Sequence, residues 1–491
     1  MLDLVIKGGL IVTPSGSGLM DLWIKGEQIT AVVPVGSETP EAKKTIDVSG
    51  KIVVPGGIEP HAHIGFPQLG NTWFAQNAGP AEQSLAAIWG GTTTLVDFAP
   101  AAYPELEPNK SPLQSVQEHM SNFVGNCHTD YSAHCNYRGR VNTERINQIK
   151  ELIDAGYPSF KLFILNPPLR QEDVTDEDQA TTASGVGPMV DMGRVAAIME
   201  QLKEHGGVAA IHAEDEDIVR YNYETAKAKG LWDWHNMHLI RSNLSEDISV
   251  RRVIKIAEHT GAAMYIVHTS AKEGVNAIAE AKAKGLPIYG ETILLYASFN
   301  ADNYKEHDGM KYHTYPSLKF EEDRQRLWNG LLNGDLAFIG TDSIATSYEG
   351  KIAGRTIADV QGGNIGIEIR MGVTYTEGVI KQGMSLGRYA DITSTNAAKL
   401  LGFYPRKGAI AVGSDADITV IDPNFRKKLT MSDLHLKDYN PWEGWDIEGW
   451  PTTVVLRGKV VLEDRKFRGD PKDGKLIPRK IDSSVLTKSS F

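Results

Sequence analysis

Eight short apolar runs, most of them separated by helix-like segments, constrain the fold of this chain more than any other feature. The runs lie near residues 52–64, 91–99, 130–136, 159–165, 206–213, 262–270, 286–294 and 336–343. Between them, patterns with helical spacing end at glycine, as in 81–89, 192–205 and 250–260. Strands that alternate with helices form parallel sheets. Eight such units predict an α/β fold, a (β/α)8 barrel of the TIM type over residues 56–404.

The segments that flank the predicted barrel have a different sequence pattern. Residues 1–55 hold short strand patterns broken by Gly and Ser, and residues 405–469 repeat that pattern. Two all-β pieces that bracket a barrel predict one composite β-sandwich domain formed from both termini. Residues 470–491 are rich in Lys, Ser and Pro. We expect them to form a C-terminal tail that is either an arm between subunits or disordered.

Composition limits the class of partner. The chain has 491 residues, 41% of them hydrophobic and 23% charged, which is typical of a soluble globular protein. A net charge of -11 argues against nucleic acid as a partner. No window approaches the about 18 apolar residues of a membrane span, and the N-terminus lacks a secretory signal pattern. The two cysteines exclude a disulfide framework. These observations predict a cytoplasmic protein with a small-molecule substrate and no membrane partner.

Polar residues stand in or at the ends of several of the apolar runs. His61 and His63 are two apart in the first run, so both imidazoles point to one face of a strand. Alone, such a pair is explained equally well as two core histidines, because a metal site needs further ligands. The later runs supply polar candidates, namely Lys161, His212, His268 and Asp342. Barrel active sites lie at the carboxyl ends of the strands, so this set predicts a metal centre there.

These polar residues belong to longer motifs. The motifs are His61-Ala-His63, Gly91–Ala99, Ser159-Phe-Lys161, His212-Ala-Glu214, His268-Thr-Ser-Ala-Lys272, Gly340-Thr-Asp342 and Gly413–Ile418. As a set they resemble the cyclic amidohydrolases, specifically the hydantoinase and dihydropyrimidinase branch, over nearly the whole chain. The resemblance implies that His61, His63 and Asp342 hold one metal ion and that His212 and His268 hold a second. It also implies that Lys161 is carbamylated by CO2 and bridges them, since a carbamate anion offers oxygens that an ammonium lacks.

The resemblance further implies the reaction. Two divalent metal ions, expected to be zinc, would hold a bridging hydroxide that attacks a carbonyl of a cyclic amide, imide or ureide ring. Asp342 would accept the proton of the attacking water and return it to the leaving ring nitrogen. Such an enzyme hydrolyses C–N bonds other than peptide bonds. Members of the branch form homotetramers, so we expect a homotetramer or homodimer.

Several positions depart from the pattern of the branch. Asn166 stands where a tyrosine usually stabilises the oxyanion, and we expect it to take that catalytic role. Tyr315 replaces a serine that holds the imide, and the substrate-binding asparagine is shifted at best to Asn364. Phe66 and Trp73 lie in a loop after the first strand, where local packing and contact with substrate explain them equally well, and we keep both as candidate residues of the substrate pocket. These departures predict a ring other than plain dihydrouracil.

Two alternatives remain open. The same metal site in other relatives hydrolyses a linear amide, urea or carbamate, and the altered substrate positions keep that reaction possible here. A non-catalytic assembly protein of the same fold is the other alternative. It is disfavoured because all six predicted ligand positions are filled.

Overall fold

The computed structural model describes residues 1–491 except 66–76, 104–108, 166–189, 361 and 437. Three residues predicted to contact substrate or the oxyanion, Phe66, Trp73 and Asn166, lie outside the described residues. In the part of the chain that is described, no helix is long and apolar enough to cross a membrane.

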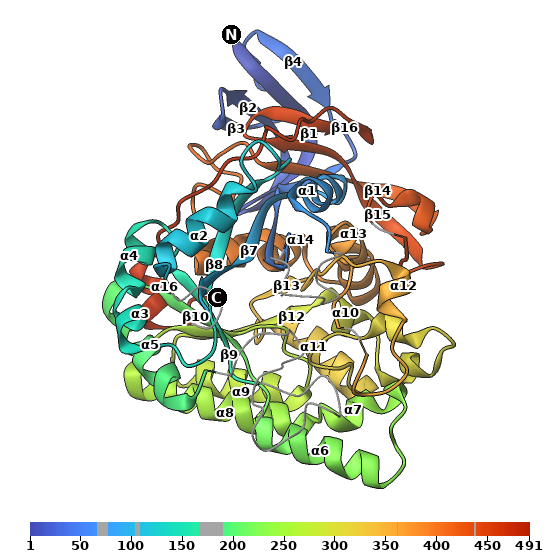
Figure 1. Cartoon of the computed structure of the whole chain (residues 1–491). Coiled ribbons are helices and arrows are strands. Elements are labelled where there is room, and N and C mark those ends of the chain that lie inside the picture. The colour runs from blue at the N-terminus through green and yellow to red at the C-terminus, as the bar shows by residue number, and fades with distance from the viewer. Residues whose placement is uncertain (66–76, 104–108, 166–189, 361, 437) are drawn as a thin grey trace.

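Eight parallel strands, hydrogen-bonded in sequence order, form a barrel that confirms the predicted fold (Figure 1). They are β6 (Gly57–Ala62), β7 (Thr92–Ala102), β8 (Asp130–Tyr137), β9 (Ser159–Phe163), β10 (Val208–His212), β11 (Met264–Ile266), β12 (Ile288–Ile293) and β13 (Phe338–Gly340). Each overlaps one predicted run. The first and last strands meet where the amide of His63 donates to the carbonyl of Ser343 at 2.8 Å. Closure therefore brings residues that follow β6 and β13 together at the carboxyl ends of the strands.

Helices surround the strands, and two of the predicted ones, 192–205 and 250–260, end at a glycine in the left-handed conformation. The helices are α1 (Pro80–Trp89), α2 (Pro112–Ser121), α3 (Thr143–Asn147), α4 (Ile149–Asp154), α5 (Met192–His205), α6 (Glu216–Ala228), α7 (Met237–Ile240), α8 (Asn243–Thr260), α9 (Lys272–Ala283), α10 (Leu294–Ser298), α11 (Glu321–Asn333), α12 (Tyr348–Lys351), α13 (Arg370–Thr374), α14 (Leu386–Ala390), α15 (Asn396–Leu401) and α16 (Ser483–Thr487). Short 3-10 or π segments are η3 (Trp234–Asn236), η4 (Ala301–Lys305), η5 (Gly309–Tyr312), η6 (Tyr375–Lys381), η7 (Asp391–Thr395) and η8 (Met431–Asp433). Gly206 ends α5 at φ 85° and Gly261 ends α8 at φ 70°.

A second sheet is built from both ends of the chain, as predicted. Its nine strands are β1 (Leu2–Thr13), β2 (Gly16–Lys25), β3 (Gln28–Pro34), β4 (Ala42–Asp47), β5 (Ile52–Pro55), β14 (Ile418–Lys428), β15 (Asp446–Leu456), β16 (Lys459–Glu463) and β17 (Lys466–Phe467). Antiparallel pairing of β5 with β14 joins the two terminal segments, and Figure 1 shows blue and red strands side by side. Apolar side chains from both segments, including Leu22, Val53 and Ile418, share one core.

The C-terminal tail packs against its own barrel, and its expected role as an arm between subunits stays a prediction. Ile477, Ile481 and Val485 are buried against residues at the starts of the barrel strands, including Val208 and Phe338. The chain therefore closes the amino-terminal end of its own barrel with this segment. The alternative of a disordered tail considers only the overall polarity of residues 470–491. It overlooks three apolar residues spaced by four, which are buried in the structure.

Candidate metal centre

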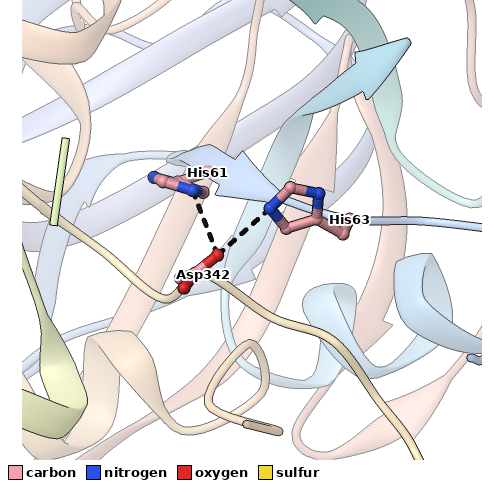
Figure 2. Close-up of side chains that lie close together, drawn as sticks. All are labelled: His61, His63 and Asp342. Atoms are coloured by element: carbon pink, nitrogen blue, oxygen red, sulfur yellow. Dashed lines mark ion pairs between the residues drawn. The ribbon is translucent and has the colours of Figure 1, made fainter. Parts of the chain in front are cut away.

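Three predicted ligands converge at the junction of the first and last barrel strands. Nε2 of His61 lies 3.1 Å from Oδ1 of Asp342, and Nε2 of His63 lies 3.2 Å from the same oxygen (Figure 2). The ligand atoms of the three side chains all lie within 4.8 Å of one another. His61 and Asp342 are buried, and His63 is half-buried. Two imidazole nitrogens and a carboxylate oxygen that face one point form a donor set suited to a divalent cation.

Two buried carboxylates orient His61. Its Nδ1 lies 2.9 Å from Oε1 of Glu291, so Nδ1–H donates there and Nε2 is left to face Asp342. Glu59 accepts the amides of His61 and Thr341, each at 3.0 Å, and ties the two strand ends together. Burial opposes protonation of His61, but Glu291 and Asp342 outweigh it and raise the pKa of His61 to about 9. The carboxylates around His61 therefore stabilise a positive charge at the centre of this cluster.

A second histidine pair lies beside the first cluster. Nδ1 of His212, at the end of β10, lies 2.9 Å from Nε2 of His268, which follows β11. The rings of His61 and His268 are 5.3 Å apart. Burial lowers the pKa of His212 to about 4 and holds that of His268 well below its ordinary value. Both rings are therefore neutral at pH 7 and offer nitrogen lone pairs to a cation.

Lys161 lies in β9 with a side chain only 3% exposed. Its positive charge helps to lower the pKa of His63 in one cluster and of His212 and His268 in the other, so it acts on both. Burial lowers the pKa of Lys161 to about 7, although Asp342 and Glu291 oppose the shift. A lysine so placed spends a large part of its time as the neutral amine at physiological pH.

Two of the predicted ligands have a strained backbone. His268 has φ 38° and Asp342 has φ 52°. Both values lie in the left-handed region, which residues other than Gly rarely adopt. Hydrogen bonds hold both turns. Glu246 accepts the amides of Ser270 and Ala271 at 2.9 Å just after His268. The side-chain amide of Asn364 donates to the carbonyls of Thr341 and Asp342, which follow β13, at 2.7 and 3.2 Å.

The residues predicted to bind substrate have other contacts in the structure. The side-chain oxygen of Asn364 accepts the amide of Gly366 at 3.0 Å, so its amide group as a whole faces backbone. The hydroxyl of Tyr315 donates to the carbonyl of Val360 at 2.9 Å, and the guanidinium of Arg241 lies 4.4 Å from the centre of its ring. A substrate contact for either residue stays a prediction.

The orienting role of four buried charged residues was not predicted from the sequence, although Glu214 belongs to one of its motifs. These are Glu59, Glu214, Arg241 and Glu291. One signal was available, because Glu59 and Glu291 stand inside apolar runs where an unpaired carboxylate is costly. For Glu214, burial opposes ionisation, but Arg241 and His212 outweigh it and lower its pKa to about 2.

The fold and this donor set define a barrel enzyme of the kind that holds metal at the carboxyl ends of its strands. The model of the amidohydrolase family matches residues 52–461, and the chain belongs to this family. The D-hydantoinase of Streptomyces coelicolor is 32% identical over 483 residues, 97% of each chain. The dihydropyrimidinase of Rattus norvegicus is 31% identical over 502 residues, 99% of this chain and 90% of the relative.

A solved structure is similar along its whole length. The crystal structure of the dihydropyrimidinase from Brevibacillus agri has a TM-score of 0.86 at 30% identity and covers 98% of this chain and 99% of that one. The predicted hydantoinase and dihydropyrimidinase branch is confirmed. The family is metal-dependent, and His61, His63 and Asp342 form a candidate metal-binding group.

Proposed function

We propose that this chain opens the ring of a cyclic amide, imide or ureide by hydrolysis. The names of its relatives, D-hydantoinase and dihydropyrimidinase, support this class of reaction. The observation that carries the proposal is the gathering of six donor side chains around the carboxyl ends of the barrel strands. They are His61, His63, Lys161, His212, His268 and Asp342.

The six side chains fit two divalent cations, which we expect to be zinc. His61, His63 and Asp342 would hold one, and His212 and His268 would hold the other. Imidazole nitrogens and carboxylate oxygens are ligands that zinc accepts. When bound, such ions supply a Lewis acid for the carbonyl and lower the pKa of water.

Lys161 is assigned as the bridge after carbamylation by CO2. The neutral amine nitrogen attacks the carbon of CO2, a new N–C bond forms and one amine proton leaves, which gives an anion with two terminal oxygens. Only the neutral amine reacts, and a pKa of about 7 makes it abundant at neutral pH. The electrostatic effect of Lys161 on histidines of both clusters supports this role.

Asp342 is assigned as the proton carrier. Burial opposes its ionisation, but His61 and His63 outweigh it and hold the pKa of Asp342 well below its ordinary value. The carboxylate is therefore ionised and can take a proton from the attacking water. Its Oδ2 accepts a hydrogen bond from the hydroxyl of Thr314 at 3.2 Å, which fixes its orientation. As the ring C–N bond breaks, Asp342 returns the proton to the leaving nitrogen.

The substrate contacts and the assembly state complete the proposal. We assign Asn166 as the oxyanion donor, and we keep Tyr315, Asn364, Phe66 and Trp73 as predicted pocket residues. We also expect a homodimer or homotetramer.

A substrate panel tests the proposed reaction. The purified protein is assayed against hydantoins, dihydropyrimidines, cyclic imides, linear ureas and linear amides, with Asp342→Asn as the inactive control. We expect ring opening of at least one cyclic class, lost in the control. Turnover of linear compounds alone would contradict the proposal and favour the linear amide alternative.

A further inference from the structure

A buried ion pair contacts His212 on the side of its ring away from His268. The Nε2 atom of His212 lies 2.7 Å from Oε2 of Glu214, and the guanidinium of Arg241 donates to the same oxygen. The side chains of His212, Glu214 and Arg241 are exposed by 1%, 0% and 1%. Solvent therefore cannot replace any partner in this chain of contacts, so each group depends on the next.

The position of Arg241 is itself fixed from two sides. Its guanidinium carbon lies 4.4 Å from the centre of the Tyr315 ring, a distance typical of cation–π stacking. The hydroxyl of Tyr315 is held by the carbonyl of Val360 at 2.9 Å. Gly362 packs against this ring so closely that an added Cβ would lie 2.4 Å from it. The carbonyl of Arg241 accepts hydrogen bonds from the side chains of Ser317 and Lys319.

We propose that Glu214 and Arg241 are positioning residues for the metal-binding edge of His212, and that Tyr315 holds Arg241 in place. A neutral imidazole carries one N–H. Glu214 accepts it at Nε2, which leaves the lone pair of Nδ1 pointing at Nε2 of His268. Arg241 keeps the carboxylate in the orientation that accepts this N–H. The inference rests on the proposed function, because it takes His212 as a metal ligand.

Loss of Arg241 has a definite physical consequence. Glu214 would remain buried without its cation, and a buried carboxylate in that state protonates or rotates toward another donor. Either change releases His212 from its tautomer and its ring orientation. Partners of this kind typically contribute 10-fold to about 100-fold to metal affinity. The expected damage is therefore to metal binding first and to turnover only as a result.

The arrangement also gives Tyr315 a role that does not require substrate contact. A serine at this position has no ring on which a guanidinium can stack. Tyr315→Phe keeps the ring and removes only the hydrogen bond to Val360, whereas Tyr315→Leu removes the stacking surface. We expect Tyr315→Phe to bind metal with the affinity of the wild type. We expect Tyr315→Leu to lose metal affinity as Arg241→Met does, but by a smaller factor.

The test measures metal affinity on the full-length protein. Arg241→Met, Arg241→Lys and wild type are loaded with Co²⁺ and titrated with a competing chelator while metal content and the visible Co²⁺ spectrum are recorded. The matched control is Arg252→Met, because Arg252 pairs with the adjacent carboxylate Asp215 at 2.7 Å and, among the described residues, forms no ion pair or hydrogen bond with His212, Glu214 or Arg241. Thermal unfolding of each variant is measured alongside.

The expected result is that Arg241→Met binds one of its two ions about 10-fold to 100-fold more weakly and shows an altered Co²⁺ spectrum. Arg241→Lys should recover part of the affinity, because it restores a charge without the planar fork. The control should match wild type. Should Arg241→Met fail to fold, Glu214→Gln, which removes the charge at nearly constant volume, decides the question by the same titration.

Wild-type affinity and spectrum in the deciding variant would overturn the positioning role. This outcome is distinct from failure of the proposed function. A protein whose Arg241 variants lose metal, but which opens no cyclic amide, would retain the positioning role and refute the substrate class.

Discussion

The rate at which Lys161 captures CO2 should depend on pH in a way that reports its burial. A pKa of about 7 means that about 9% of the amine is neutral at pH 6 and about 91% at pH 8. The rate of carbamate formation should therefore rise about 10-fold between these pH values and level off above pH 8. An ordinary lysine with a pKa of about 10.4 would give a rise of about 100-fold with no plateau.

The assay follows carbamate formation on metal-free protein. Protein stripped of metal at low CO2 is mixed with ¹³C-labelled CO2, held at a constant dissolved concentration at each pH, and the carbamate carbon is followed by NMR. Lys161→Ala is the control that should give no signal. A rate that still climbs 10-fold for each pH unit above pH 8 would refute the reasoning that burial makes this amine reactive.

Three further predictions concern single residues. Lys161→Ala should lose turnover and metal, and a short carboxylic acid with excess Zn²⁺ should restore part of the turnover by standing in for the carbamate; near wild-type turnover with two metals per chain would contradict the bridge. Asn166→Ala should lower kcat about 10²-fold with the metals still bound, because it removes an oxyanion donor, and unchanged kinetics would place that donor elsewhere. Ile481→Ala should destabilise the protein by about 2–5 kcal/mol, measured by denaturant unfolding, because its buried side chain closes the barrel. The exposed Leu476→Ala is the control for that change.

The barrel could be predicted from sequence because its strands are covered on both faces. A strand such as Val208–His212 is buried along its whole length and reads as a continuous apolar run, so a polar residue at its end stands out. The same contrast identified His212 and Asp342. Glycine at the ends of helices, as at Gly206, marked the boundaries.

The supporting contacts could not be predicted because they join residues from distant parts of the chain. Nothing near Tyr315 indicates that its ring stacks on Arg241, so the residue was interpreted only against the serine it replaces. The side chain of Glu291 contacts His61, which is 230 residues away in the sequence. The packing of the tail against the barrel was not predicted for a different reason, because Ile477, Ile481 and Val485 are too few to change the polar composition of the segment.

We expect ring opening to depend on metal held by these six side chains. The most direct test measures metal content and turnover of a cyclic amide on the same samples, during removal of metal by a chelator and its return as Zn²⁺ with CO2. We expect two divalent ions per chain and turnover that falls and recovers in proportion to metal content. Full turnover by metal-free protein would contradict this dependence on metal.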